Sequence, residues 1–378
     1  MATFVKRNQI NIDGQTTLPR EYFTSPELFA QELENIFYRR WLCVGRADQL
    51  PNPGDYFVQE VGRESVIVLK DEGGTFRAYY NVCRHRGTRL CEEHSGQFSE
   101  TITCPYHLWA YGLDGRLIGA PSTHDIKGFN KANYPLHRVA IDTWEGFLFI
   151  DLSGKAPPLI ESFEAIHERA SLYNLPNLKR SRQIVYDVNC NWKLLVQNYS
   201  ECYHCAPVHP TLASLTPPTS GENDLIEGPL LGGYMVLNEG TGSMTMSGRS
   251  CGINVADLPD EELNRVYYYS VFPNTLLSLH PDYVMFHTLW PIDERHTRIL
   301  CDWLFHPDSL NNPKFDPEDG IAFWDMTNRQ DWHICEQSQH GVESRAYVPG
   351  PYSARECLSA QFDREVVRSL GKKPTWPE

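Results

Sequence analysis

The chain has 378 residues, of which 41% are hydrophobic and 12% aromatic, and its formal net charge is −14. This length and composition describe an ordered globular protein with room for two domains. The acidic balance excludes nucleic acid as the expected partner, because its phosphates would be repelled. No stretch reaches the roughly 18 apolar residues of a membrane span, and residues 1–20 lack an apolar signal region. We therefore expect a cytoplasmic protein with no membrane partner.

The first two-fifths of the chain predict a helix followed by a small β domain. Apolar residues recur at helical spacing from Ser25-Pro26 as far as Trp41, and proline suits the first helical position. We expect residues 1–40 to form a helical segment that packs on the C-terminal domain. Residues 41–155 should form the β domain, because strand patterns follow and a Gly/Pro-rich linker comes next. The predicted strands are 56–61, 65–70, 76–82 and 146–151, and the linker is 153–158.

Two short motifs in the β domain pair a cysteine with a histidine. The first runs from Cys83 to His85 and the second from Cys104 to His107. Two thiolates and two imidazoles are the ligands of a Rieske 2Fe-2S cluster, whose potential lies at roughly −150 to +300 mV. A structural zinc site uses the same ligand types. Zinc fingers, however, usually pair cysteine with cysteine and histidine with histidine, so the mixed pairs favour the iron–sulfur cluster.

The remaining nine of the eleven cysteines have no such pattern. A cluster that needs free thiolates fits a reducing compartment, where disulfides are rare. We therefore expect these nine cysteines to be buried thiols.

Residues 156–378 predict a second domain of a different architecture. A helical run over 160–173 leads into the segment 187–209, and residues 212–260 are rich in Gly, Ser, Thr and Pro, which predicts loops. Strand patterns joined by turns then predict an antiparallel meander, and a long helix is expected from about 317 to 339. The predicted strands of the meander are 266–272, 275–280, 283–290 and 297–305. The whole chain is thus of the α+β class.

A second group of metal-ligand residues follows Asn191-Trp192-Lys193, which opens a helix. Pro207 should end that helix between His204 and His209, which places one histidine at the helix end and the other on the loop beyond. Two imidazoles and one carboxylate form the facial triad of non-haem Fe(II) oxygenases, which leaves positions open for oxygen and substrate. The alternatives are ordinary core histidines, or a redox pair made by Cys202 and Cys205. The one-electron cluster on the same chain favours the iron site.

The third ligand should be a carboxylate from the C-terminal helix, which offers Asp325 and Asp331. Asp331 shares a helical stripe with Trp324 and other mainly apolar residues, whereas Asp325 points away from it. A buried carboxylate needs a partner, and a metal provides one. The helical phase therefore favours Asp331. The glycine-rich stretch 228–233 does not match the dinucleotide fingerprint, so electrons should come from a separate flavin- or ferredoxin-type reductase.

Over nearly its whole length the chain resembles the catalytic subunit of the Rieske-type non-haem iron oxygenases. Within that family it is most similar to the quaternary-ammonium branch, which includes glycine betaine monooxygenase. Three departures from the ring-hydroxylating members are Glu201 in place of Asp, Leu108 in place of Gly and Gln197 in place of Glu. The resemblance rests on the two Cys/His pairs, the Asn-Trp-Lys opening, His204, His209, Asp331 and the segments 84–91, 201–205, 243–246, 324–328 and 349–353.

The resemblance implies a Rieske β domain joined to a helix-grip catalytic domain, in a head-to-tail homotrimer. The cofactors would be one 2Fe-2S cluster, bound by Cys83, His85, Cys104 and His107, and one mononuclear Fe(II). Electrons would pass from the cluster of one subunit to the iron of its neighbour through Glu201, with Asn198 beside it in the catalytic site.

The resemblance also implies that O2 is used to hydroxylate an N-methyl group of a quaternary ammonium substrate such as glycine betaine, with release of formaldehyde. Aromatic side chains on the meander would attract such a cation. Hydroxylation of an aromatic ring or demethylation of an aromatic ether by the same metals remains open, as does a non-catalytic electron carrier or zinc-stabilised module. The aromatic candidates are Tyr267, Tyr268, Tyr269, Phe272, Tyr283 and Phe286.

Overall fold

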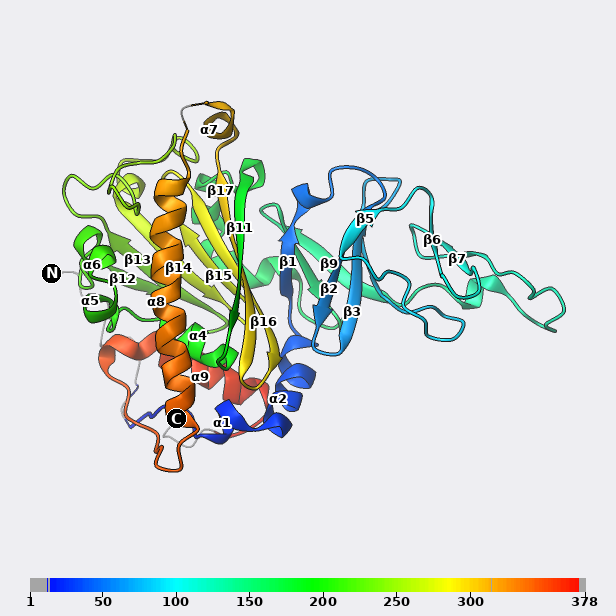
Figure 1. The fold of residues 1–378 in the computed structure, drawn as a ribbon, viewed down its shortest axis with the longest axis horizontal. Coiled ribbons are helices and arrows are strands. Elements are labelled where there is room, and N and C mark those ends of the chain that lie inside the picture. Colours follow the sequence, from blue (N-terminus) through cyan, green and yellow to red (C-terminus); the bar gives the residue numbers. More distant parts are fainter. Residues whose placement is uncertain (1–11, 13, 314, 374–378) are drawn as a thin grey trace. The chain divides into compact units, whose positions relative to one another are not determined.

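A computed structural model describes residue 12, residues 14–313 and residues 315–373 (Figure 1). The chain forms two compact units. One combines the described residues up to Ile36 with those from Ile160 onward, and the other spans Phe37–Leu159. The expected divisions were 40/41 and 155/156. Among the described residues, no helix is long and apolar enough to cross a membrane.

The unit Phe37–Leu159 is built from antiparallel strands. Its larger sheet has the order β1-β10-β9-β4-β3-β2-β5, and a smaller sheet has the order β6-β7-β8. Strands β3 and β4 form a hairpin, and Asp71 holds its turn by accepting from the Thr75 amide at 2.8 Å and from Arg77 Nε at 2.8 Å. The strands are β1 (Leu42–Arg46), β2 (Asp55–Val61), β3 (Glu64–Lys70), β4 (Phe76–Tyr80), β5 (Ser95–Gln97), β6 (Thr101–Thr103), β7 (Ala110–Gly112), β8 (Leu117–Gly119), β9 (Arg138–Trp144) and β10 (Phe147–Asp151).

The other unit contains one antiparallel sheet of the order β11-β17-β16-β15-β14-β13-β12. The four predicted strands of the meander are its middle members. The stretch 212–260, predicted to be rich in loops, also contains two strands that the sequence did not reveal, and strand β11 was not predicted. Strand β11 lacks the apolar pattern of a strand, because its first five residues are charged or polar and exposed. The strands are β11 (Lys179–Val188), β12 (Glu222–Leu225), β13 (Leu230–Val236), β14 (Arg265–Val271), β15 (Thr275–Leu279), β16 (Val284–Asp293) and β17 (His296–Phe305).

Helices cover this sheet, and the long helix α8 runs across one face of it (Figure 1). The predicted N-terminal helix ends at Phe37 and does not reach Trp41. The α-helices are α1 (Glu21–Thr24), α2 (Pro26–Glu32), α3 (His167–Leu172), α4 (Trp192–Tyr199), α5 (Cys205–Val208), α6 (Pro210–Leu215), α7 (Pro307–Asn311), α8 (Glu318–Val342) and α9 (Cys357–Ser369). A π-helical segment, Leu33–Phe37, follows α2, and 3-10 turns lie at Ala47–Gln49, Lys131–Asn133, Leu159–Ser162, Glu164–Ile166, Leu175–Asn177, Glu262–Asn264 and Ala354–Glu356.

A buried ion pair ties the N-terminal helix to α4. Lys193 Nζ lies 2.5 Å from Glu32 Oε1, and both side chains are fully buried. The other oxygen of Glu32 accepts from the Trp192 indole at 2.8 Å. Burial lowers the pKa of Lys193, while Glu32 opposes that shift. The Asn-Trp-Lys motif thus serves to anchor the start of α4, the helix that leads into the candidate site.

Loss of this ion pair should destabilise the unit strongly. We expect Glu32→Ala to reduce its stability by about 3 to 5 kcal/mol, because Lys193 would be left as a buried charge without its partner. Glu27→Ala, which removes an exposed carboxylate from the same helix, is the control and should change stability little. Differential scanning calorimetry of the full chain measures both. Equal effects from the two substitutions would contradict the anchoring role.

Candidate active site

Helix α4 begins at an Asn191 cap, whose side chain accepts from the Lys193 amide, and ends at Tyr199. The prediction that this helix continues to Pro207 was wrong. After Ser200 the backbone turns, and Glu201 accepts hydrogen bonds from the amides of Tyr203 and His204, the latter at 3.2 Å. The side-chain carboxylate therefore takes N–H groups that a continuing helix would have bonded to carbonyls.

The short helix α5 lies between the two histidines. His204 precedes it and His209 follows it, so they flank one helical turn. Pro207 does not end a helix here. It lies within the first turn of α5, where a proline costs no hydrogen bond. The five-residue spacing is thus converted into a close approach of the two imidazoles, whose ring centroids are 5.2 Å apart.

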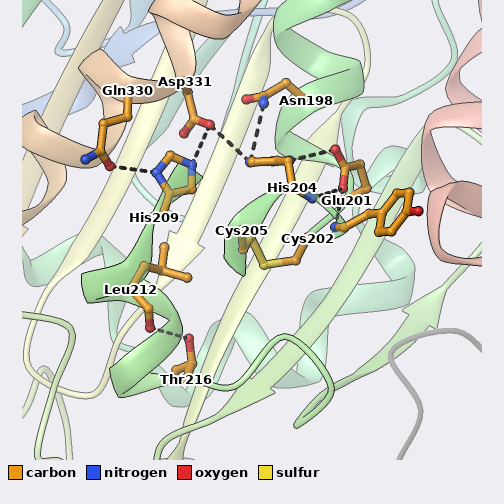
Figure 2. Close-up of a disulfide and its surroundings, with 11 residues drawn as sticks. Asn198, Glu201, Cys202, His204, Cys205, His209, Leu212, Thr216, Gln330 and Asp331 are labelled. Atoms are coloured by element: carbon orange, nitrogen blue, oxygen red, sulfur yellow. Dashed lines mark hydrogen bonds and ion pairs between the residues drawn. A yellow bond between two sulfur atoms is a disulfide. The ribbon is translucent and has the colours of Figure 1, made fainter. Parts of the chain in front are cut away.

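Asp331 on α8 completes a group of three ligand-type side chains (Figure 2). Its Oδ1 lies 3.2 Å from His204 Nε2 and 2.8 Å from His209 Nε2. All three ligand atoms lie within 4.8 Å of one another. Asp325 lies elsewhere, where it accepts from the Tyr186 hydroxyl at 2.8 Å and pairs with Arg329. The structure therefore brings Asp331 to the histidines, as the helical phase predicted.

The outer hydrogen bonds of the histidines prepare them to bind a metal. His204 Nδ1 lies 2.6 Å from Glu201 Oε1, and His209 Nδ1 lies 2.7 Å from Gln330 Oε1. Both partners are acceptors, so each Nδ1 can donate its proton to them, and each Nε2, on the Asp331 side, is the nitrogen left to bind a metal. Acceptors that bond the ring nitrogen not used for the metal orient metal-binding histidines in this way. The donor set, two imidazoles and a carboxylate, fits a mononuclear non-haem iron.

Electrostatics at His204 and Asp331 favour the charged forms of these two side chains. Burial opposes a charge on His204, yet hydrogen bonds to Asp331 and Glu201 raise its pKa to about 10. Burial likewise opposes a charge on Asp331, yet the two histidines lower its pKa to about 2. Without a metal, a proton on His204 therefore provides the positive charge beside Asp331. A bound divalent ion would displace that proton and satisfy the same carboxylate.

A cavity adjoins the three ligands and is walled by aromatic rings. Of the six aromatic residues proposed from the sequence, Tyr268 lines it, and Trp324, which was not among them, faces the same space. Their ring centroids lie 6.1 Å apart at an interplanar angle of 63°. Trp324 could have been found from the sequence, because it lies on the same helical stripe as Asp331. Asn198 also lines the cavity, and its Nδ2 lies 3.4 Å from His204 Nε2.

Two glycines on β13, which line this cavity, allow the neighbouring strands to approach closely. A Cβ built on Gly232 would lie 2.1 Å from the carbonyl oxygen of Tyr268, and one on Gly233 would lie 2.1 Å from the carbonyl oxygen of Glu222. Any larger residue would push the neighbouring strands apart. The glycine-rich stretch that failed to match a nucleotide site therefore belongs to a wall of the cavity.

The candidate cluster ligands lie on two similar turns of the β unit. The Cys83 carbonyl accepts from the Gly87 amide at 3.0 Å, and the Cys104 carbonyl accepts from the Leu108 amide at 3.1 Å. Gly87 and Leu108 both have positive φ, at 76° and 59°. The second turn thus places a leucine in the left-handed conformation that glycine adopts more easily.

The two histidines of these turns lie together, and so do the two cysteines. The rings of His85 and His107 lie 4.6 Å apart, and His85 stacks on Trp109 at 4.8 Å. The Cys83 thiol is near enough to that of Cys104 to raise its pKa, although burial is the larger cause. Burial, followed by the nearness of His107, lowers the pKa of His85, which favours the neutral imidazole that binds metal. Two buried thiols opposite two imidazoles fit a 2Fe-2S cluster of the Rieske type.

One expectation about the cysteines was wrong. Cys202 and Cys205 form a disulfide, with their Cα atoms 4.9 Å apart. The nine other cysteines form no disulfide. A separation of three residues across the start of α5 brings the two Cα atoms within the range that a disulfide needs.

Comparison with known proteins identifies both units. Residues 40–130 match the Rieske [2Fe-2S] domain, and residues 175–372 match the ring hydroxylating alpha subunit (catalytic domain). The glycine betaine monooxygenase oxygenase subunit of Pseudomonas aeruginosa is 31% identical over 90% of this chain and 86% of its own length. The carnitine monooxygenase oxygenase subunit of Escherichia coli is 28% identical over 88% of this chain and 85% of its own.

Solved structures of similar proteins share the fold of this chain. The quaternary ammonium Rieske monooxygenase CntA, in complex with gamma-butyrobetaine, has a TM-score of 0.79 and 26% identity, over 95% of this chain and 97% of that one. A naphthalene 1,2-dioxygenase from Rhodococcus has a TM-score of 0.77 at 18% identity, over 97% of each chain, and shows the shared fold.

A Rieske 2Fe-2S domain joined to a non-haem iron catalytic domain defines the oxygenase component of a Rieske-type oxygenase, an oxidoreductase. The chain belongs to the family of Rieske oxygenase subunits that includes the glycine betaine and carnitine monooxygenases. The zinc alternative is thereby set aside.

The two aspartates of α8 provide a test of the metal ligands. We expect about three irons and about two acid-labile sulfides per wild-type chain, from one cluster and one mononuclear site. Asp331→Ala should lose about one iron while the visible spectrum of the cluster persists, because a ligand of the mononuclear site is gone. Asp325→Ala, on the same helix, should keep all three. Iron and sulfide analysis measures this, and the reverse pattern would show that Asp331 is not the ligand.

Proposed function

We propose that this protein is the oxygenase component of a monooxygenase that hydroxylates an N-methyl group of a quaternary ammonium substrate of the glycine betaine type. The product, a carbinolamine, would collapse to formaldehyde and the demethylated amine. The observation that carries the proposal is the three-ligand group beside a cavity walled by Tyr268 and Trp324. The relatives named for glycine betaine and carnitine support the same substrate class.

The cavity suits a cation without N–H groups. Aromatic faces attract a quaternary ammonium ion by roughly 0.5 to 2 kcal/mol each when it is desolvated, and two such rings meet here at a wide angle. Of the polar side chains near the ligands, Glu201 contacts the nitrogen of His204 that faces away from Asp331, whereas Asn198 contacts the same nitrogen as Asp331 (Figure 2). A substrate held against the rings would therefore present a methyl group to the metal and keep its charge on the aromatic side.

Each residue near the metal has a distinct role in this proposal. His204, His209 and Asp331 hold the iron, which supplies the activation of O2 when bound. Glu201 orients His204 by accepting its Nδ1 proton, and Gln330 does the same for His209. Asn198 lies where its amide can contact a group bound beside His204.

We further propose that electrons reach the iron from the cluster of a neighbouring copy, through Glu201, in a homotrimer that closes head to tail. Glu201 supports this role because its carboxylate already contacts the iron ligand His204, while the adjacent Tyr203 is exposed. A separate NAD(P)H-dependent reductase of the flavin or ferredoxin type would supply the cluster.

The substrate class can be tested directly. With a competent reductase and NADH, glycine betaine or a related N-methylated cation should yield formaldehyde in proportion to the NADH consumed. Tyr268→Leu should weaken the binding of the cation by about tenfold, the order of a cation–π contribution, and Tyr267→Leu, outside the cavity, serves as the control. Formaldehyde release and NADH oxidation are the measurements. Tight coupling with an uncharged aromatic compound, and none with betaines, would instead support an aromatic substrate.

The electron path can be tested with mixed trimers. Cys83→Ser chains should keep the iron without a working cluster, and Asp331→Ala chains should keep the cluster without the iron. Neither homotrimer should turn over. Co-assembly of the two variants should restore activity, because at some subunit interfaces an intact cluster then faces an intact iron site.

Adding Glu201→Gln to the chains with the working iron should abolish this restored activity while both metal spectra persist, because the bridging charge is removed. Formaldehyde per mixed trimer is the measurement. If verified mixed trimers stay inactive without the Glu201 change, the electron path lies within one subunit.

A further inference from the structure

The disulfide between Cys202 and Cys205 lies in the turn that carries the candidate iron ligand. The two cysteines enclose Tyr203 and His204, and Glu201 precedes them (Figure 2). Both sulfur-bearing residues line the catalytic cavity, although they are only 7% and 5% exposed. A small oxidant or reductant would therefore reach them through the cavity where O2 and substrate meet.

Stabilisation of the fold does not account for this disulfide. A disulfide stabilises mainly by restricting the unfolded chain, and this effect is smallest for short loops. The pair closes a loop between residues only three positions apart. The nine other cysteines form no disulfide, and two of them are proposed ligands that must be thiolates. In chains that keep their other cysteines reduced, a single disulfide is usually catalytic or redox-sensing.

The disulfide adds a covalent link to a turn that is otherwise held by hydrogen bonds. Glu201 accepts from the amides of Tyr203 and His204 and from His204 Nδ1. The backbone adds a bond of 3.4 Å from the Cys205 amide to the Cys202 carbonyl. The sulfur bridge spans the same residues and fixes the start of α5, on which the distance between His204 and His209 depends. Opening the bridge would remove the covalent link and leave these hydrogen bonds to hold His204 toward Asp331.

We propose that Cys202 and Cys205 form a reversible redox pair whose disulfide state holds the mononuclear iron more tightly than its dithiol state. This rests on the proposed iron site. The oxidant that forms the bridge is hydrogen peroxide, the two-electron reduction product of O2. One thiolate attacks peroxide and gives a sulfenic acid and hydroxide, and the second thiol then displaces that hydroxyl group as water. In sum, two thiols and one peroxide give one disulfide and two waters. A thiol or phosphine reductant reverses the step and is itself oxidised.

The first part of the test measures the state of the pair. Anaerobic holoenzyme is equilibrated in glutathione buffers that range from oxidising to strongly reducing, then alkylated, and the peptide that carries both cysteines is examined by mass spectrometry. The proposal expects conversion between disulfide and dithiol within this range. A pair that stays a dithiol in every buffer, or a disulfide in every buffer as structural bridges do, would overturn it.

The second part measures iron. After treatment with tris(2-carboxyethyl)phosphine, transfer of the mononuclear iron to ferrozine should be about tenfold faster than from untreated enzyme, the size expected when the support of a metal ligand is weakened. The Cys202→Ser/Cys205→Ser chain should release iron at the fast rate with or without the phosphine. Cys251→Ser, which replaces a free cysteine that contacts Asp282, should behave like wild type.

The visible spectrum of the cluster, followed in the same samples, shows that cluster iron is not the source. Equal release rates from the disulfide and dithiol forms would contradict the proposal. Absence of any third iron, even in untreated enzyme, would instead show that the iron site itself was wrongly assigned, and formaldehyde assays test the substrate class independently of both.

Discussion

The carboxylate of Glu201 is the constraint on which the catalytic site depends. It ends helix α4 by taking the amide groups of the next turn, and with its second oxygen it fixes the ring of His204. One side chain therefore determines both where the backbone leaves the helix and which nitrogen of the imidazole faces Asp331. An aspartate, shorter by one methylene, would need a closer turn to reach the same three groups.

The rest of the unit holds the two elements that this turn connects. The buried Lys193–Glu32 pair anchors the start of α4, and Gln339 links α8 to the same region by accepting from the Asn191 amide at 3.0 Å. Because α4 and α8 are joined in this way, Asp331 is presented to the histidines from a rigid helix. The glycines of β13 let the strands pack closely in one wall of the cavity, so the site combines fixed donors with a cavity beside them.

Much of this arrangement could be predicted from the sequence, and the remainder could not for identifiable reasons. The cysteine–histidine pairs and the phase of α8 depend on local spacing, so the cluster residues and Asp331 could be named in advance. The end of α4 was missed because Glu201 acts through its side chain on its own backbone, which periodicity does not show. Strand β11 was missed because its first five residues are charged or polar and exposed. The Cys202–Cys205 pair was named only as an alternative, because cysteine spacing alone does not show which cysteines are bonded.

The central claim is that His204, His209 and Asp331 hold one Fe(II) with positions open to oxygen beside a cation-binding cavity. Electron paramagnetic resonance of the anaerobic, reduced protein with nitric oxide tests this most directly, because nitric oxide binds Fe(II) only where a coordination position is free. The account predicts the high-spin signal of an Fe(II)–nitric oxide complex, altered by glycine betaine and absent from the Asp331→Ala chain. A normal cluster signal in wild-type protein with no such complex, despite a full complement of iron, would contradict it.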